Sequence, residues 1–170
     1  MKKPELSSTT DTIVSLSAMV IALASIVVSV WQGMETRKHY RLSVRPKIEI
    51  FYNSDSERQL IGYTMCNNGL GPAMITEKNI YIDGEPVPWS GFSGYDEMLK
   101  RLGLQPYLKS HGAMGAGMTV KAGEQKNIID FHIPDENLYQ EKIMDIYSRL
   151  RFEIHYESMY GESFICVVPR

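Results

Sequence analysis

The chain has 170 residues, with 18 Lys and Arg against 20 Asp and Glu, for a net charge of −2. This near balance, with no basic stripe beyond residues 37–47, argues against a nucleic-acid-binding protein. The two cysteines and four histidines show none of the spacings typical of metal sites, and no phosphate-binding loop is present, so no cofactor or metal is expected.

Residues 1–11 are expected to form an N-terminal tail, residues 12–43 a transmembrane helix with a basic extension, and residues 44–170 one folded domain. The run from Thr12 to Gln32 carries no charge. Because about 20 apolar residues in a helix suffice to cross a bilayer core about 30 Å thick, the run predicts one membrane span. Later apolar runs are too short and too often broken by charges to span a membrane.

A cleaved signal peptide is the alternative interpretation of this run. Lys2 and Lys3 give a basic start, and residues 22–24 (ALA) resemble a cleavage site. Acidic residues in the same N-terminal region, and the continuation of the apolar run as far as Trp31, favour an anchor that stays in the protein.

The residues that flank a span predict its orientation, because basic residues resist translocation. More of them follow the run than precede it, among them Arg37, Lys38 and Arg41. The sequence therefore predicts a single-pass protein in contact with the lipid bilayer and with its C-terminal domain in the cytoplasm; a periplasmic domain is the alternative. Trp31 and these three basic residues are the candidate membrane-interface residues.

Small residues recur along one stripe of the predicted span, at spacings of three and four. They are Ser15, Ala18, Ala22, Ser25 and Ser29. Small side chains let two helices approach closely, so this stripe is a candidate helix-packing face, for a second copy or for another membrane protein. The alternative is that Ala and Ser are simply common in single spans.

Alternating and β-branched segments between turn signals predict strands across the domain. The expected strands are 47–50, 59–66, 73–82, 85–89, 127–133, 151–157 and 163–168. Two helical faces interrupt them, one ending near Gly103 and one beginning after Asp135 as N-cap. The first face carries Tyr95, Met98, Leu99 and Leu102; the second carries Tyr139, Ile143, Ile146 and Leu150. This pattern predicts a mainly β fold, a sandwich or barrel with two inserted short helices.

Two segments outside the predicted strands carry candidate partner-contact residues. Residues 110–117 are expected to form a loop, where Met114 and the nearby Met118 offer adaptable apolar contacts. Trp89 and Phe92 flank Gly91 and serve either as an interface anchor or as a cover for one end of the core.

The two cysteines, Cys66 and Cys166, both fall in strand-like runs. They would pair in an oxidising compartment and remain small buried thiols in the cytosol. The predicted orientation favours unpaired thiols.

Three short motifs together resemble a known group of proteins: HYRLSVRP at 39–46, NGLGPAMI at 68–75 and IHYESMYG at 154–161. The chain resembles a loose group of uncharacterised bacterial proteins with one N-terminal transmembrane helix and an immunoglobulin-like β-sandwich. The resemblance implies that architecture and a bacterial inner membrane. It transfers no catalytic residue, and it associates the group with accessory parts of larger membrane or defence systems.

No catalytic constellation stands out, because the sequence lacks a nucleophile elbow, a paired-histidine motif and a P-loop. The leading hypothesis is therefore a non-enzymatic, membrane-tethered interaction module with a protein partner. The alternatives are a ligand-binding or enzymatic domain of unrecognised type, and a small membrane effector that acts through helix assembly.

Overall fold

The computed structural model describes residues 6–88, 93–112 and 114–168, and it divides the chain into two compact units, Met1–Leu42 and Ser43–Arg170. The first unit is a helix, α1 (Leu6–Ser43), of 38 residues. α1 is long and apolar enough to cross a membrane. It begins at Leu6, before the uncharged run, so Asp11 lies within the helix.

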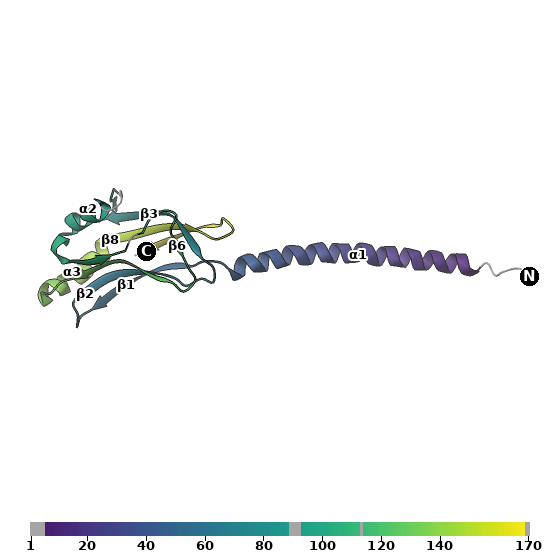
Figure 1. Cartoon of the computed structure of the whole chain (residues 1–170), viewed down its shortest axis with the longest axis horizontal. Helices are drawn as coiled ribbons and strands as arrows, with labels where there is room; N and C mark the ends of the chain where they lie inside the picture. Colours follow the sequence, from purple (N-terminus) through teal and green to yellow (C-terminus); the bar gives the residue numbers. More distant parts are fainter. Residues whose placement is uncertain (1–5, 89–92, 113, 169–170) are drawn as a thin grey trace, which may run out of the picture. The chain divides into compact units, whose positions relative to one another are not determined.

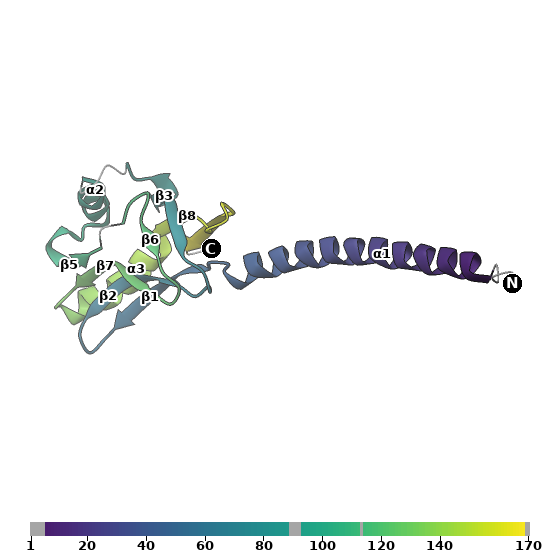
Figure 2. The same cartoon turned by 45° about the vertical axis from the view of Figure 1, so that its right-hand side comes forward.

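The second unit contains two antiparallel sheets (Figure 1, Figure 2). The first sheet has the order β1-β2-β7-β5, with bounds Ile48–Asp55, Leu60–Asn67, Gln125–His132 and Leu108–His111. The second has the order β4-β3-β8-β9, with bounds Glu85–Pro86, Ala73–Ile82, Leu150–Glu157 and Ser163–Val168. The short strand β6 (Thr119–Val120) pairs with the start of β3. A long apolar helix followed by two antiparallel sheets confirms the coarse form of the predicted mainly β architecture.

The two sheets share one hydrophobic core. The ring of Tyr63 from β2 lies 4.8 Å from the ring of Phe152 in β8, centroid to centroid, so the sheets contact each other face to face. β8 alternates as its sequence predicts: Phe152, Ile154 and Tyr156 are buried, and the residues between them are less so. Period-two burial of this kind is what a strand with one face on a core requires.

Two helices close the core. In α2 (Ser93–Leu102) all four residues of the predicted apolar face are buried, and Gly103 follows with a positive φ of 67°. That left-handed residue ends the helix without strain because glycine has no Cβ. In α3 (Glu136–Arg149) the carboxylate of Asp135 accepts the N–H of Leu138 at 2.9 Å, which confirms the predicted N-cap.

The structure differs from the predicted elements at several places. Leu150, predicted on the face of the second helix, is the first residue of β8, because α3 ends at Arg149. β1 continues to Asp55, well past Ile50, because it pairs with β2 over its whole length. Residues 108–111 form β5 beside β7, and the short 3-10 helix η1 (Gln105–Tyr107) precedes it, although residues 110–117 were predicted to be a loop. Of the strand predicted at 85–89, the described part, residues 85–88, forms a strand only at Glu85–Pro86. Both cysteines are free thiols.

Candidate functional site

The predicted packing stripe lies on the exposed surface of α1. The hydroxyl of Ser25 donates to the carbonyl oxygen of Ile21 at 2.8 Å, and that of Ser29 donates to the carbonyl oxygen of Ser25 at 2.7 Å. These hydroxyl protons are already bonded within the helix. The stripe would therefore favour a neighbouring helix through its small side chains, which permit close packing, and not through hydrogen-bond donation. Helix association through Ser15, Ala18, Ala22, Ser25 and Ser29 stays a prediction.

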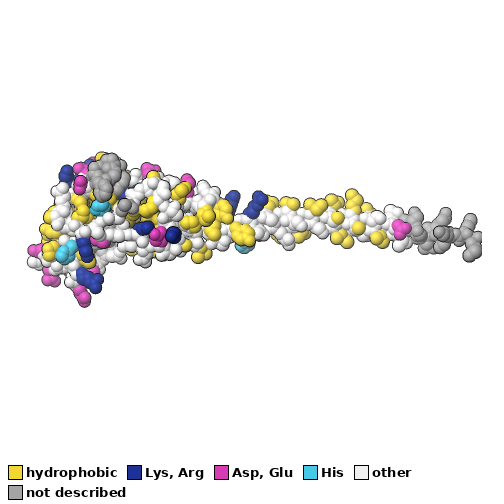
Figure 3. Space-filling view, viewed as in Figure 1, with side chains coloured by type: hydrophobic (Ala, Val, Ile, Leu, Met, Phe, Trp, Pro, Cys, Tyr) yellow, Lys and Arg dark blue, Asp and Glu magenta, His cyan; other side chains and the backbone are white. Residues whose placement is uncertain are grey.

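The candidate membrane-interface residues all have exposed side chains near the C-terminal end of α1. Trp31, at the end of the uncharged run, is 67% exposed. Figure 3 shows hydrophobic side chains along α1 and Lys or Arg side chains gathered at its C-terminal end, where Arg37, Lys38 and Arg41 lie in the sequence. Aromatic and basic residues beside an apolar run are typical of a membrane–water interface, and this role stays a prediction.

A groove of about 570 Å³ runs between β1 and β9, which are the edge strands of the two sheets. Its lining residues are 47–51, 156 and 165–168. On its outer side, Phe51 of β1 is 45% exposed and Ile165 of β9 is 60% exposed. The groove therefore combines apolar side chains with two strand edges.

The pairing of β1 decides which of its backbone groups face the groove. Asn68 N–H donates to the carbonyl oxygen of Lys47 at 2.8 Å, so the backbone groups of Lys47 point toward β2. Backbone direction alternates along a strand, so those of Ile48 and Ile50 point away from β2. Ile48 N–H accordingly donates to the hydroxyl of Tyr156 across the groove at 3.2 Å.

The outward backbone groups of β9, the edge strand of the second sheet, follow by the same reasoning. Ser158 N–H donates to the carbonyl oxygen of Glu162 at 2.9 Å, at a point in register with the β8–β9 ladder. Alternation then directs the backbone groups of Phe164 and Cys166 toward β8, and those of Ile165 and Val167 away from it. Hydrogen-bonding groups from two sheets thus border one groove.

Charged side chains mark the end of the groove at which β1 begins. Lys47 Nζ lies 2.7 Å from Glu49 Oε1. The Asn68 amide also donates to Glu49. Hydrogen bonds from Lys47 and Asn68 hold the pKa of the Glu49 carboxyl below its usual range. Glu49 therefore stays ionised at neutral pH.

The sequence pattern does not predict this groove. The available signals were Phe51 and Ile165, which are apolar residues at outward positions of their strands. The sequence pattern shows that such residues exist, but it does not show that β1 and β9 lie side by side.

A second cluster lies within the domain core around Lys78. The pairing of β3 with β8 shifts between Ile75 and Glu77, and after this bulge Lys78 faces inward and is only 6% exposed. Its Nζ lies 3.5 Å from the hydroxyl of Tyr95 and 5.0 Å from the centre of that ring. The ring of His111 stacks on Tyr95 with centroids 4.5 Å apart.

Burial changes the protonation of this cluster. It lowers the pKa of the Lys78 ammonium from 10.5 to about 7, because a low-dielectric surrounding disfavours the charged form. It raises the pKa of Tyr95 to about 12, so that hydroxyl keeps its proton and donates to the carbonyl oxygen of Gly112 at 2.9 Å. Lys78 shares the inward face of β3 with Ile80 and Ile82, but a lysine side chain by itself gives no sequence signal of burial.

The predicted partner-contact residues lie elsewhere than expected. Met114 is 6% exposed and belongs to the core, so the prediction of a surface contact is wrong for its side chain. Met118 is partly buried and packs against the core. The cause is that this segment binds back to β3: Ile75 N–H donates to Met118 O and Gly117 N–H to Ile75 O, each at 2.8 Å. Trp89 and Phe92 lie outside the described residues.

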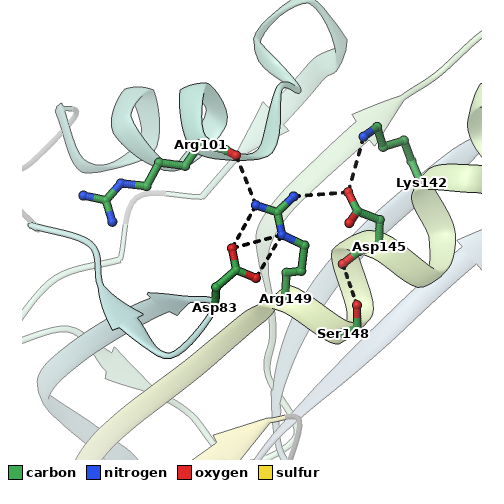
Figure 4. A network of polar contacts seen from close by, with 6 residues as sticks. All are labelled: Asp83, Arg101, Lys142, Asp145, Ser148 and Arg149. Carbon is green, nitrogen blue, oxygen red and sulfur yellow. Dashed lines mark hydrogen bonds and ion pairs between the residues drawn. The ribbon is translucent and has the colours of Figure 1, made fainter.

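A polar network joins the end of α3 to its neighbours (Figure 4). The guanidinium of Arg149 binds both carboxylate oxygens of Asp83, contacts Asp145 and donates to the carbonyl oxygen of Arg101 at 3.3 Å. Hydrogen bonding to Arg149 lowers the pKa of the Asp83 carboxyl. The residues of this network bind one another and connect α2, α3 and the β3–β4 turn. The network therefore has a structural role.

Residues 6–88, 93–112 and 114–168 contain no group of three His, Cys, Asp or Glu side chains placed to hold a metal ion. No protein family model matches the sequence, and no curated protein is significantly similar to it.

Proposed function

We propose that this protein is a membrane-tethered, non-enzymatic interaction module, and that the groove between β1 and β9 is its docking site. The observation that supports this function is the presence of two strand edges, with outward-directed backbone groups, along one groove of about 570 Å³. Edges of this kind are usually blunted or covered in soluble proteins, because they pair readily with other chains.

The mode of binding that fits the groove is strand addition. An extended segment of a partner protein would pair its backbone with the outward groups of Ile165 and Val167, while its alternate side chains contact apolar residues in the groove. Main-chain pairing supplies affinity and the side-chain contacts supply specificity.

We further propose that the domain has an immunoglobulin-like fold. In that fold one sheet has the order A-B-E-D and the other C′-C-F-G when strands are lettered along the chain. The orders β1-β2-β7-β5 and β4-β3-β8-β9 fit this scheme, with β5 as D, β7 as E, and the short β6 as an addition. The inter-sheet disulfide of antibody domains has no counterpart, since both cysteines are free.

The proposed location is a bacterial inner membrane, with the domain in the cytoplasm. The support is the basic cluster after the apolar run of α1. C-terminal fusions to a reporter that is active only in the periplasm, and to one that fluoresces only in the cytoplasm, test the orientation. Activity of the periplasmic reporter alone would reverse it.

Affinity purification of the full chain from solubilised membranes tests the interaction function. We expect a specific partner to co-purify with the wild type. Val167→Pro should lose that partner, because proline removes the outward N–H without touching the β8–β9 ladder.

Val167→Ala is the matched control, since it also removes the valine side chain but keeps the N–H. The proposal predicts that the alanine variant retains the partner, and that both variants unfold at similar temperatures. Recovery of the bait alone by the wild type argues against an interaction module. Equal recovery by the proline and alanine variants instead argues against strand addition.

The Lys78 cluster supports a second candidate function, a ligand-binding or enzymatic domain. A lysine with a pKa of about 7 is substantially neutral at physiological pH, and a neutral amine is a nucleophile. Trace labelling with acetic anhydride at pH 7 tests this function. Preferential modification of Lys78 over the exposed Lys109 supports a reactive, accessible amine, and absence of modification assigns Lys78 to the closed core.

A further inference from the structure

The base of the domain, defined here as residues 43–47, 67–72 and 158–162, is one continuous surface. Leu70 N–H donates to the carbonyl oxygen of Arg45 at 3.1 Å, and the guanidinium of Arg45 lies 4.7 Å from the centre of the Phe164 ring beside the β8–β9 turn. Both sheets therefore end at this surface, and the domain's first residue, Ser43, belongs to it.

Large apolar side chains project from the turns of the base. Leu70 is 74% exposed, Met159 is 69% exposed and Tyr160 is 51% exposed. Tight turns normally carry polar residues, so three large exposed apolar side chains on two turns at one end of the domain define a candidate interaction surface. The other exposed large apolar side chains of the described domain fall on the groove, on α3 and at the start of β3.

The first of these turns is held rigidly. The buried amide of Asn67 accepts the N–H groups of Lys47 and Gly69 and donates to the carbonyl oxygens of Gly71 and Val120, at 2.8 to 3.1 Å. A Cβ on Gly71 would lie 1.7 Å from the carbonyl oxygen of Val44, so only glycine permits this approach. Leu70 is thus presented on a fixed turn.

The second turn is equally constrained. The hydroxyl of Ser158 accepts the N–H groups of Tyr160 and Glu162 at 3.2 and 3.3 Å, and Gly161 adopts a positive φ of 73°. The backbone that carries Met159 and Tyr160 is therefore held in one conformation, so binding at this turn orders little further backbone.

The charges near the base are mutually compensated. The charged residues of the base are Arg45, Lys47 and Glu162. Lys47 pairs with Glu49 at 2.7 Å, which leaves one cation and one anion, Arg45 and Glu162. An apolar surface with balanced charge suits insertion into the headgroup region more than attraction to an anionic partner.

The chain itself indicates which partner covers this surface. Residues 33–43 of α1 follow the uncharged run directly and, as a helix, extend about 16 Å. Through this segment the base is covalently linked to the proposed span, which gives it a high local concentration of lipid.

We propose that the base of the domain is a lipid-binding surface, with Leu70, Met159 and Tyr160 inserted among the headgroups of the membrane that α1 crosses. This inference rests on the proposed membrane span of α1 and is independent of the β1–β9 groove. Its consequence is that the domain is held in one orientation on the bilayer, not left to rotate on a stalk.

Fluorescence quenching of the full chain in lipid nanodiscs tests the proposal. Single cysteines at Met159, at Ser56 in the β1–β2 turn at the opposite end of β1, and at Val20 in α1 carry a polarity-sensitive dye. Both native cysteines are replaced by serine. Phospholipids with a nitroxide group near the headgroup or in the acyl chain act as quenchers. We expect strong headgroup quenching at 159, little at 56, and acyl-chain quenching at 20.

The outcomes separate the two proposals. Quenching at 20 with equally weak quenching at 159 and 56 overturns the lipid-binding surface and leaves the anchor intact. Absence of quenching at 20 overturns the membrane span itself. As a further requirement, Leu70→Asp should reduce quenching at 159 several-fold. It should not lower the unfolding temperature, since Leu70 is largely exposed. Added salt should have little effect on quenching of the chain that keeps Leu70. Unchanged quenching in Leu70→Asp also contradicts insertion.

Discussion

Asn67 is fully buried and uses every hydrogen-bonding position of its amide. Asn67→Ala removes this side-chain partner from two carbonyl oxygens and two backbone N–H groups. Because unsatisfied buried polar groups destabilise a fold by about 1–3 kcal/mol each, and some will reach water, we expect a loss of roughly 2–4 kcal/mol in the free energy of unfolding. Chemical denaturation of the full chain in detergent measures it.

The control is Asn53→Ala, which removes an exposed amide bonded only to Thr64 Oγ1 among the contacts seen for its side chain. That variant should shift the denaturation midpoint little. A similar shift for both variants would show that Asn67 does not organise the base.

The buried Lys78 leads to a second prediction, which concerns how the stability of the domain changes with pH. Its pKa is about 7 in the folded protein and about 10.5 when unfolded, so between these values the unfolded chain binds more protons. The stability of the wild type should therefore rise with pH from about 7 to 10.5. Lys78→Met removes a buried charge and should stabilise the domain at neutral pH by about 1–4 kcal/mol, and by less near pH 10.

Denaturation midpoints of both proteins at neutral and alkaline pH measure this gain. Lys109→Met on β5 serves as the control, because Lys109 is exposed. Destabilisation by Lys78→Met at pH 7 would show that the ammonium forms a productive contact in the core.

At the scale of elements, the apolar window of α1 has no buried residue. If the small-residue stripe packs against a second copy, Ala22→Leu should weaken association roughly fivefold to tenfold by preventing close approach. Energy transfer between labelled chains in micelles measures it. Val27→Leu, on the bulky face, should have no effect, and equal behaviour of the two variants would remove the stripe from consideration.

The elements also show where sequence patterns suffice. The first and last residues of β3, the apolar face of α2 and the N-cap of α3 follow from local periodicity and capping residues. All three are found as predicted. β5 was missed because its four residues are held by pairing with β7, which is distant in sequence. Met114 was misplaced for a related reason: the segment around it binds back to β3.

At the scale of the whole molecule, the hydrophobic core closes entirely within residues 48–168. We therefore expect residues 43–170, expressed without the preceding helix, to unfold cooperatively at a temperature close to that of the domain in the full chain. Circular dichroism in the near ultraviolet measures the transition. A non-cooperative transition would mean that the helix or its membrane is required for folding.

The sequence by itself determined the long apolar helix, its basic flank, most strands and the helical faces, because each depends on residues close together in the chain. Only the tertiary structure decided the candidate sites. The β1–β9 groove, the inward turn of Lys78 and the apolar base each bring together residues from strands and turns far apart in sequence. No local periodicity encodes such neighbours, since they arise from how two sheets pair and pack.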